Sequence, residues 1–98
     1  MNRPIDFDVE ARAEFEAASN WYAKQSPRAA VGFVAAVEHI LQAIAEDPTR
    51  FPKTLAGCRR SSLRRYPYSI IYYCHAEDIV VVAVAHMKRR PGYCKHRK

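Results

Sequence analysis

The clearest pattern of apolar and polar positions lies between Leu63 and Tyr93. Residues 68–75 alternate at period two, in aromatic and β-branched types that favour pleated sheet. One face of this strand would carry Tyr68, Ile70, Tyr72 and Cys74, and the other Ser69, Ile71, Tyr73 and His75. A turn at 75–78 leads into the nearly unbroken apolar run 79–85, which is typical of a covered central strand. The two segments predict an antiparallel hairpin, in which we expect Cys74 to be buried.

Two helices are predicted before this hairpin. Asp8 is placed as an N-cap for a helix that runs to about Lys24, with apolar residues recurring at helical spacing. Ser26 and Pro27 form a second start signal, a capping hydroxyl followed by proline at the first helical position. The second helix carries a wide apolar stripe and ends at Asp47-Pro48. Because the link between them is so short, the helices should form an antiparallel hairpin.

The remaining segments complete an α+β pattern. Residues 4–7 predict an opening edge strand and 58–62 a further short strand, whereas the tail, 91–98, looks too short and polar to form an element. Helices grouped before a strand meander predict one domain spanning residues 1–98. We expect the helical hairpin to pack on one face of a three- to four-stranded antiparallel sheet.

Charge divides the chain into two unlike halves. Residues 1–48 contain four Lys/Arg and eight Asp/Glu, a net charge of −4. Residues 49–98 contain twelve Lys/Arg and two acids, +10, which accounts for the overall +6. Five of these cations gather at one end of the predicted strand pair: Arg64, Arg65, Lys88, Arg89 and Arg90. The basic half predicts a binding face for a polyanion, either nucleic acid or an acidic protein partner.

Composition also narrows the class of protein. The three cysteines are odd in number and widely spaced, which indicates neither a disulfide framework nor a zinc site. We therefore expect no metal and no cofactor. The sequence begins without a charged-then-apolar leader and shows no long apolar run, so we expect no signal peptide, no membrane partner and a cytoplasmic location.

A series of short segments runs in order along nearly the whole chain. They are Ala17–Tyr22 (AASNWY), Phe33 with Val37, Asp47-Pro48, Phe51-Pro52, Arg64–Tyr73 (RRYPYSIIYY), Ile79–His86 (IVVVAVAH) and Arg89–Tyr93 (RRPGY). In this series the chain resembles the RelE/ParE superfamily, the toxins of bacterial type II toxin–antitoxin modules, and within it the plasmid-stabilisation group. The resemblance implies the fold described above and a cognate antitoxin encoded by the adjacent gene. It also implies one of two targets: the RelE branch cleaves mRNA in the ribosomal A site, and the ParE branch poisons DNA gyrase.

Metal-independent RNA cleavage needs a base for the 2′-hydroxyl, cations for the phosphate and an acid for the leaving oxygen. The candidate catalytic residues are Arg65, His86, Arg89 and Tyr93, with His96 a further candidate for proton transfer. His86 ends the last predicted strand, on the face of Val80, Val82 and Val84, and an ordinary pKa near ~6.5 suits either role. A structural role is an equal alternative for His86, and Tyr93 could instead pack on the sheet edge. Residues assigned to nucleic-acid or target binding are Arg59, Arg60, Arg64, Lys88 and Arg90.

Two departures from the nuclease pattern favour the ParE-like function. Where the resemblance places a catalytic arginine beyond the last strand, this chain has Met87, and a lysine-rich segment is represented only by Lys53. The leading prediction is therefore a ParE-like gyrase poison. A RelE-like mRNA endonuclease is the alternative, and a non-toxic basic nucleic-acid-binding domain is a further one.

The antitoxins of this superfamily carry an acidic, partly disordered C-terminal segment that folds around the toxin. The basic half of the chain would steer such a segment, and the apolar helical hairpin would offer it a groove. Trp21 and Tyr22 are candidate anchors for it, because these residue types are enriched among binding hot spots. Core packing is an equal alternative for both.

Overall fold

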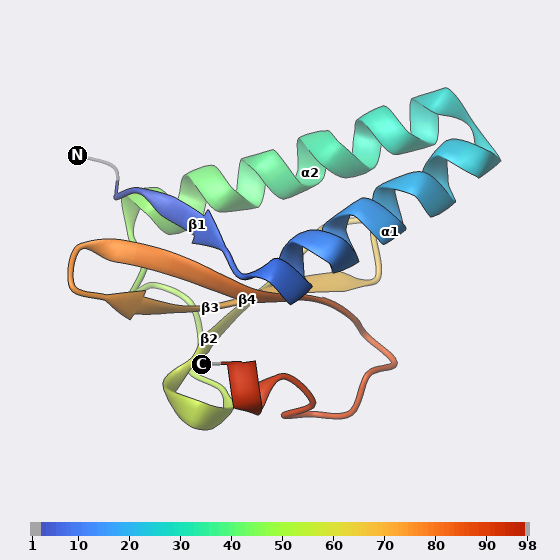
Figure 1. The fold of residues 1–98 in the computed structure, drawn as a ribbon. Helices are drawn as coiled ribbons and strands as arrows, with labels where there is room; N and C mark the ends of the chain where they lie inside the picture. Colours follow the sequence, from blue (N-terminus) through green and yellow to red (C-terminus); the bar gives the residue numbers. More distant parts are fainter. Residues whose placement is uncertain (1–2, 98) are drawn as a thin grey trace.

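The computed structural model describes residues 3–97 as a helical hairpin laid across one face of a four-stranded sheet (Figure 1). The elements are β1 (Ile5–Phe7), α1 (Val9–Gln25), α2 (Pro27–Glu46), β2 (Arg59–Ser62), β3 (Tyr68–His75) and β4 (Asp78–His86). Two short 3-10 helices, η1 (Leu55–Gly57) and η2 (Lys95–Arg97), flank the last three strands in the chain. The C-terminal segment lies on the opposite face of the sheet from the helices (Figure 1). The predicted α+β layer arrangement is confirmed.

Capping side chains set the ends of both helices. The Asp8 carboxylate accepts a hydrogen bond from the Glu10 N–H at 3.1 Å. Ser26 serves both helices: its N–H donates to the Tyr22 carbonyl and closes α1, while its hydroxyl accepts from the Ala29 N–H at 3.0 Å and opens α2. One residue thus turns the chain between the two helices, as the short link predicted.

The sheet is mixed rather than purely antiparallel, which corrects the prediction. Its strand order is β1-β4-β3-β2, and β1 runs parallel to β4 while the other pairs are antiparallel. The helical hairpin and two strands separate β1 from β4 in the sequence, so no tight turn dictates their relative direction. Period-two alternation reveals a strand but not its partner, and so it could not show this pairing.

A β-bulge in β4 reverses the predicted alternation of its side chains. Ile71 pairs with Ala83 but the next residue, Tyr72, pairs with Val81, so Val82 is the extra residue. Val81 and Val84 consequently both lie in the core beneath the helices, and Val82 lies in a second cluster on the other face. The prediction that Val80, Val82 and Val84 share one face was therefore wrong.

Aromatic rings fill the core between the helices and the sheet. Phe33 of α2 is fully buried, and its ring lies 5.0 Å from that of Tyr22 and 5.4 Å from that of Tyr68. Tyr66 completes the cluster by packing its hydroxyl end against Gly32, where a Cβ would collide with it. Gly32 is thus required for close approach inside a helix, at some cost in helix propensity.

The opposite face of the sheet has its own smaller core. Cys58 and Cys94 are buried there with Val82, Ala83 and Ala85. The prediction that the tail forms no element was wrong, because residues 95–97 form η2 and Cys94 seals the sheet face. The predicted burial of Cys74 was also wrong, since it lies exposed two residues before the β3–β4 turn.

Helix α2 has the length and composition of a candidate membrane span, with a mean hydropathy of 1.4 over an 18-residue window. The prediction that the chain has no long apolar run was wrong in this respect, because the alanines of α2 raise its hydropathy. In the fold this helix buries Phe33, Val37, Ile44 and Ala45, and 22% of the apolar window is buried in all.

Candidate functional site

Two hollows meet at the C-terminal end of β4. The first, the helix-side cleft, has a volume of about 480 Å³ and lies between α1 and the ends of β3 and β4; its lining includes Ala17, Trp21, Tyr22, Tyr68, His86 and Arg89. The second, the basic pocket, has a volume of about 190 Å³; its lining includes Thr54, Arg60, Ser69, His86, Arg89, Arg90 and Tyr93. His86 and Arg89 border both, so the candidate residues at the end of β4 are brought together.

Aromatic side chains form the walls of the helix-side cleft. Trp21 is 56% exposed and meets the Tyr22 ring edge-on at 5.0 Å. Tyr22 in turn stacks on buried Phe33, which makes it part of the core as well as part of the wall. Trp21 is therefore the exposed member of the pair. The core packing that was the alternative for both residues is observed for Tyr22 and not for Trp21.

His86 is oriented by its own loop. Its Nδ1 accepts a hydrogen bond from the Lys88 N–H at 3.1 Å, and its ring lies edge-on to Tyr68 at 5.0 Å. With Nδ1 engaged as an acceptor, the neutral ring carries its proton on Nε2. In this state the Nε2–H of His86 can donate a hydrogen bond, but neither ring nitrogen has a free lone pair with which to act as a base.

Tyr93 is held in a network centred on the carboxylate of Glu14. The Tyr93 hydroxyl donates to Glu14 Oε2 at 2.8 Å, and the Val84 N–H donates to Glu14 Oε1 at 3.0 Å. Arg97 donates from Nη1 to both Glu14 Oε1, at 2.9 Å, and the Val82 carbonyl, at 3.0 Å. Burial, and then the hydrogen bond to Glu14 and its charge, raise the pKa of Tyr93 well above its ordinary value. The phenol therefore stays neutral and is occupied in joining the tail to α1.

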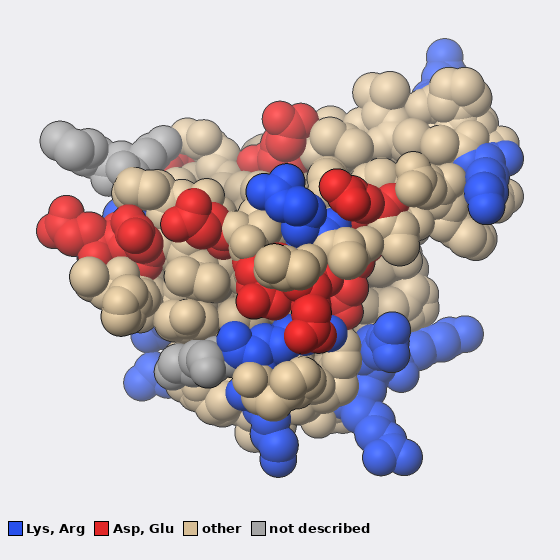
Figure 2. Space-filling view, in the orientation of Figure 1, with Lys and Arg blue, Asp and Glu red and all other residues tan. Residues whose placement is uncertain are grey.

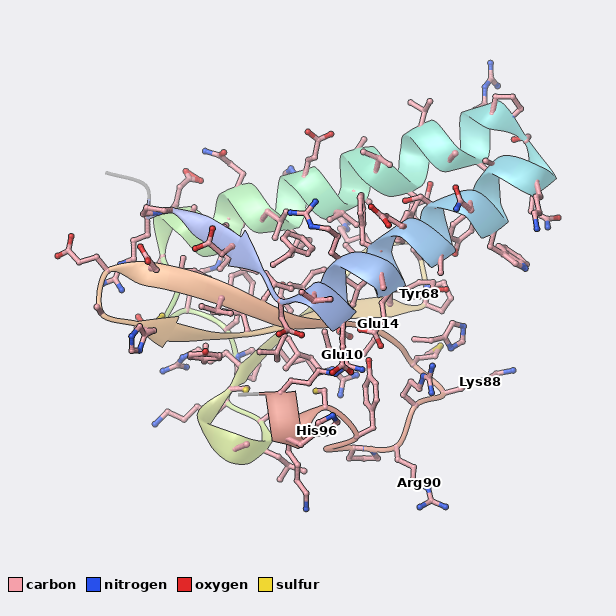
Figure 3. All side chains as sticks on the ribbon, in the orientation of Figure 1. Glu10, Glu14, Tyr68, Lys88, Arg90 and His96 are labelled. Carbon is pink, nitrogen blue, oxygen red and sulfur yellow. The ribbon has the colours of Figure 1, made fainter. Side chains whose placement is uncertain are left out.

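Glu10 adds a second carboxylate to the same network. Its Oε2 lies 2.9 Å from Arg97 Nε, although without the alignment of a hydrogen bond, and 4.0 Å from His96 Nε2. Figure 3 shows Glu10 and Glu14 projecting from α1 toward the tail. The sequence reasoning missed Glu14, and its one local signal is that it lies three residues after Ala11 and four before Ala18, both buried.

The arginines have separate surroundings. Arg59 donates from Nη1 to the Phe51 carbonyl at 2.7 Å and is occupied in bracing the segment before β2. Arg60 donates from Nε to the Ser69 hydroxyl at 3.2 Å on the border of the basic pocket. The guanidinium of Arg89 lies 5.2 Å from the Tyr93 ring centroid. Arg65, at a positive φ of 71° in the β2–β3 connection, lines neither hollow.

The outermost cations surround the same end of the sheet. Lys88 and Arg90 extend outward from the loop after β4 (Figure 3), and Arg64 is exposed in the β2–β3 connection. On the face drawn in Figure 2, Lys and Arg gather along the lower border, and most acidic side chains lie above them over β1 and the start of α1, while further Lys and Arg side chains lie among the acids and at the far end of the helices. The basic end of the sheet is thus one concentration of positive charge on this face.

Comparison with known proteins agrees with this architecture. The model of the family described as ParE toxin of type II toxin–antitoxin system, parDE, matches residues 5–91. Among solved structures the chain is similar to the chromosomal ParDE toxin–antitoxin system from P. aeruginosa. The TM-score is 0.74 at 17% sequence identity, covering 86% of this chain and 95% of that one, a likeness that shows the fold. The comparison with curated proteins gave no match.

The family match spans most of the chain and includes both helices and all four strands. The predicted resemblance to the RelE/ParE superfamily is therefore confirmed, and with it the prediction of a toxin that has a cognate antitoxin. The chain belongs to the ParE toxin family of type II toxin–antitoxin systems.

Proposed function

We propose that this toxin poisons DNA gyrase without catalysing a reaction, and that it does so in the cytoplasm as part of a plasmid-stabilisation module. The observation that carries the proposal is the bond between Tyr93 and Glu14. Tyr93 resembles the C-terminal tyrosine of the ribonuclease branch by its distance from the last strand, and a role in proton transfer would need its hydroxyl free. Here the hydroxyl is occupied at 2.8 Å by a carboxylate, in a setting that raises its pKa. Releasing it would leave the Glu14 carboxylate, whose side chain is only 18% exposed, without this donor, which costs free energy.

Two further features support a non-enzymatic mode. Met87, which is 66% exposed on the border of the basic pocket, stands where the resemblance implies a catalytic arginine, and its thioether carries no charge to stabilise a phosphate. The Nδ1 of His86 accepts a hydrogen bond from the Lys88 N–H, so the neutral ring is set to donate a hydrogen bond from Nε2 rather than to abstract a proton. A poison needs a shaped and charged surface, and the basic end of the sheet provides one.

A second candidate function, metal-independent mRNA cleavage, has one observation in its favour. His86, Arg89 and Tyr93 do meet around the basic pocket, so a cation and two groups with exchangeable protons lie together. Substituting Tyr93 then distinguishes the two candidate functions, because mRNA cleavage would require its hydroxyl and gyrase poisoning would not.

The antitoxin is proposed to occupy the helix-side cleft. Glu14 also lines the cleft, but its carboxylate is paired with Arg97. The exposed ring of Trp21, the cation Arg89 and the donor His86 then suit an acidic segment carrying an apolar anchor. Substituting the exposed Trp21 should weaken antitoxin binding with little effect on folding. This selective loss is what separates a hot spot from a core residue.

The test uses purified chain with DNA gyrase and supercoiled plasmid. The proposal predicts gyrase-dependent linear DNA and loss of supercoiling, unchanged in Tyr93→Phe once its folding has been checked by circular dichroism. The chain and its Tyr93→Phe variant are each also added to translating ribosomes, and the mRNA ends are mapped by primer extension. Cleaved mRNA that disappears with Tyr93→Phe, together with unaffected gyrase, would replace the proposal by the nuclease function.

A further inference from the structure

The basic pocket has the chemistry of an anion site on the sheet face opposite the helices. Three arginines border it, Arg60, Arg89 and Arg90, and hydroxyls of Thr54 and Ser69 lie in the same lining. Its lining contains no Asp or Glu. We propose that this pocket binds a backbone phosphate of duplex DNA.

Arg60 is positioned for this role by a buried neighbour. Its Nε donates to the hydroxyl of Ser69, which is only 4% exposed and lies 3.2 Å from the Ser62 hydroxyl. The bond at Nε gives the two terminal nitrogens of Arg60 a defined direction. These two nitrogens make no hydrogen bond to residues 3–97. A guanidinium with two parallel donors matches two phosphate oxygens, which is the strong bidentate arrangement. Arg59, one residue earlier, does not line the pocket, and its Nη1 donates to the Phe51 carbonyl.

Arg89 and Arg90 supply the opposite border. Arg89 is steadied over the Tyr93 ring at 5.2 Å from its centroid, and Arg90 extends outward from the loop after β4 (Figure 3). One cation is thus placed by packing and the other is able to reach a neighbouring phosphate. Lys88 in the same loop extends the charge beyond the pocket (Figure 3).

The rings near the pocket favour a duplex over a single strand. Proteins that bind single strands pair their cations with exposed aromatic faces on which bases stack. The pocket lining offers only His86 and Tyr93. His86 meets Tyr68 edge-on, and the guanidinium groups of Arg89 and Arg97 lie 5.2 and 5.1 Å from the Tyr93 ring centroid. Because both rings are already engaged in contacts within the protein, binding would depend on backbone phosphates rather than on base stacking and would be insensitive to sequence.

DNA binding at this pocket goes beyond the proposed action on gyrase and does not depend on it. A gyrase poison meets its target on DNA, so a phosphate contact would place it beside the duplex. The contact is measured with DNA alone, and its failure is therefore distinguishable from a failure to inhibit gyrase.

The experiment is fluorescence anisotropy of a short labelled duplex titrated with the full chain over a range of salt concentrations. The test variant is Arg60→Gln/Arg89→Gln/Arg90→Gln. The control is Arg3→Gln/Lys24→Gln/Arg28→Gln, which removes the same charge from exposed positions outside the pocket. Single-stranded RNA of the same length is titrated in parallel, and circular dichroism confirms that both variants fold.

We expect the test variant to lose about tenfold or more in affinity for the duplex. The slope of log K against log salt should fall in magnitude by about 0.9 for each phosphate that the variant no longer neutralises. The control variant should keep most of its affinity. Equal losses in the two variants would show that net charge alone binds DNA and would overturn the pocket. An unchanged test variant, or tighter binding to RNA than to the duplex, would also refute the proposal.

Discussion

Removing the Glu14 carboxylate should destabilise this protein more than removing any exposed acid on the same helix. Glu14 accepts hydrogen bonds from Val84, Tyr93 and Arg97, which lie 70, 79 and 83 residues away in the sequence. Its side chain is 18% exposed and that of Arg97 is 9% exposed, so water can replace few of these bonds. Glu14→Ala therefore removes the hydrogen-bond acceptor of a phenol, a backbone N–H and a guanidinium nitrogen at once.

The magnitude follows from these partners. Deleting one partner of a buried ion pair costs about 3–5 kcal/mol. Glu10 remains 2.9 Å from Arg97 Nε and offsets part of that loss. We expect Glu14→Ala to cost about 3 kcal/mol, and Glu14→Gln, which keeps hydrogen-bonding atoms but not the charge, about 1–2 kcal/mol. Each kcal/mol should lower Tm by about 4–8 °C in a domain of this size.

Urea denaturation followed by circular dichroism measures these losses. The matched control is Glu16→Ala, which removes an exposed acid from the same helix and should change stability by less than about 0.5 kcal/mol. The reasoning fails if Glu14→Ala matches this control. It also fails if the alanine and glutamine variants are equally stable, because hydrogen bonding would then contribute nothing.

Three other predictions test different parts of the molecule. Burial raises the pKa of Tyr72 to about 12 from an ordinary 10.0, which favours the neutral phenol in the folded state. The free energy of unfolding should therefore be constant below pH 10 and fall as the pH rises from 10 to 12. Urea titrations across that range should show a less steep fall for Tyr72→Phe. Gly32→Ala should lower the free energy of unfolding by about 1 kcal/mol, because the new Cβ collides with the Tyr66 hydroxyl. In a Tyr66→Phe background, which lacks that hydroxyl, the same change should raise it by up to about 1 kcal/mol through helix propensity. Equal effects in both backgrounds would refute the collision. Trp21→Ala should weaken antitoxin binding by at least about 2 kcal/mol in calorimetry while Tm stays nearly constant, and unchanged affinity would remove the helix-side cleft as the antitoxin site.

Local signals predicted most of the fold. Asp8, Ser26 and Asp47 mark the ends of the two helices within a residue or so of the observed bounds, because a cap is a contact between near neighbours in the chain. The hairpin of β3 and β4 was equally visible, since its turn joins the strands directly. Features of this kind need no knowledge of the rest of the fold.

The errors arose from contacts between distant residues. The parallel pairing of β1 with β4 and the bulge at Val82 depend on which strands meet, and the exposure of Cys74 depends on which faces are covered. The tail appeared structureless because Cys94 and Arg97 find their partners far away in the chain. A hydropathy pattern does not carry such information.

The candidate site was predicted in part for the same reason. His86, Arg89 and Tyr93 were predicted and do gather at the end of β4. Charge could not distinguish Arg59, which braces the chain, from Arg60, which faces the pocket. The catalytic and binding roles assigned to these residues remain predictions, and the variants above test them.

Pulse-labelling of cells just after induction of this chain without its antitoxin tests the proposed mode of action. DNA synthesis and protein synthesis are followed in the same culture, with a vector-only culture as control. We predict that incorporation into DNA falls first and translation follows. A fall in translation before any change in DNA synthesis would contradict gyrase poisoning and point to mRNA cleavage, and undiminished growth would contradict toxicity of this chain.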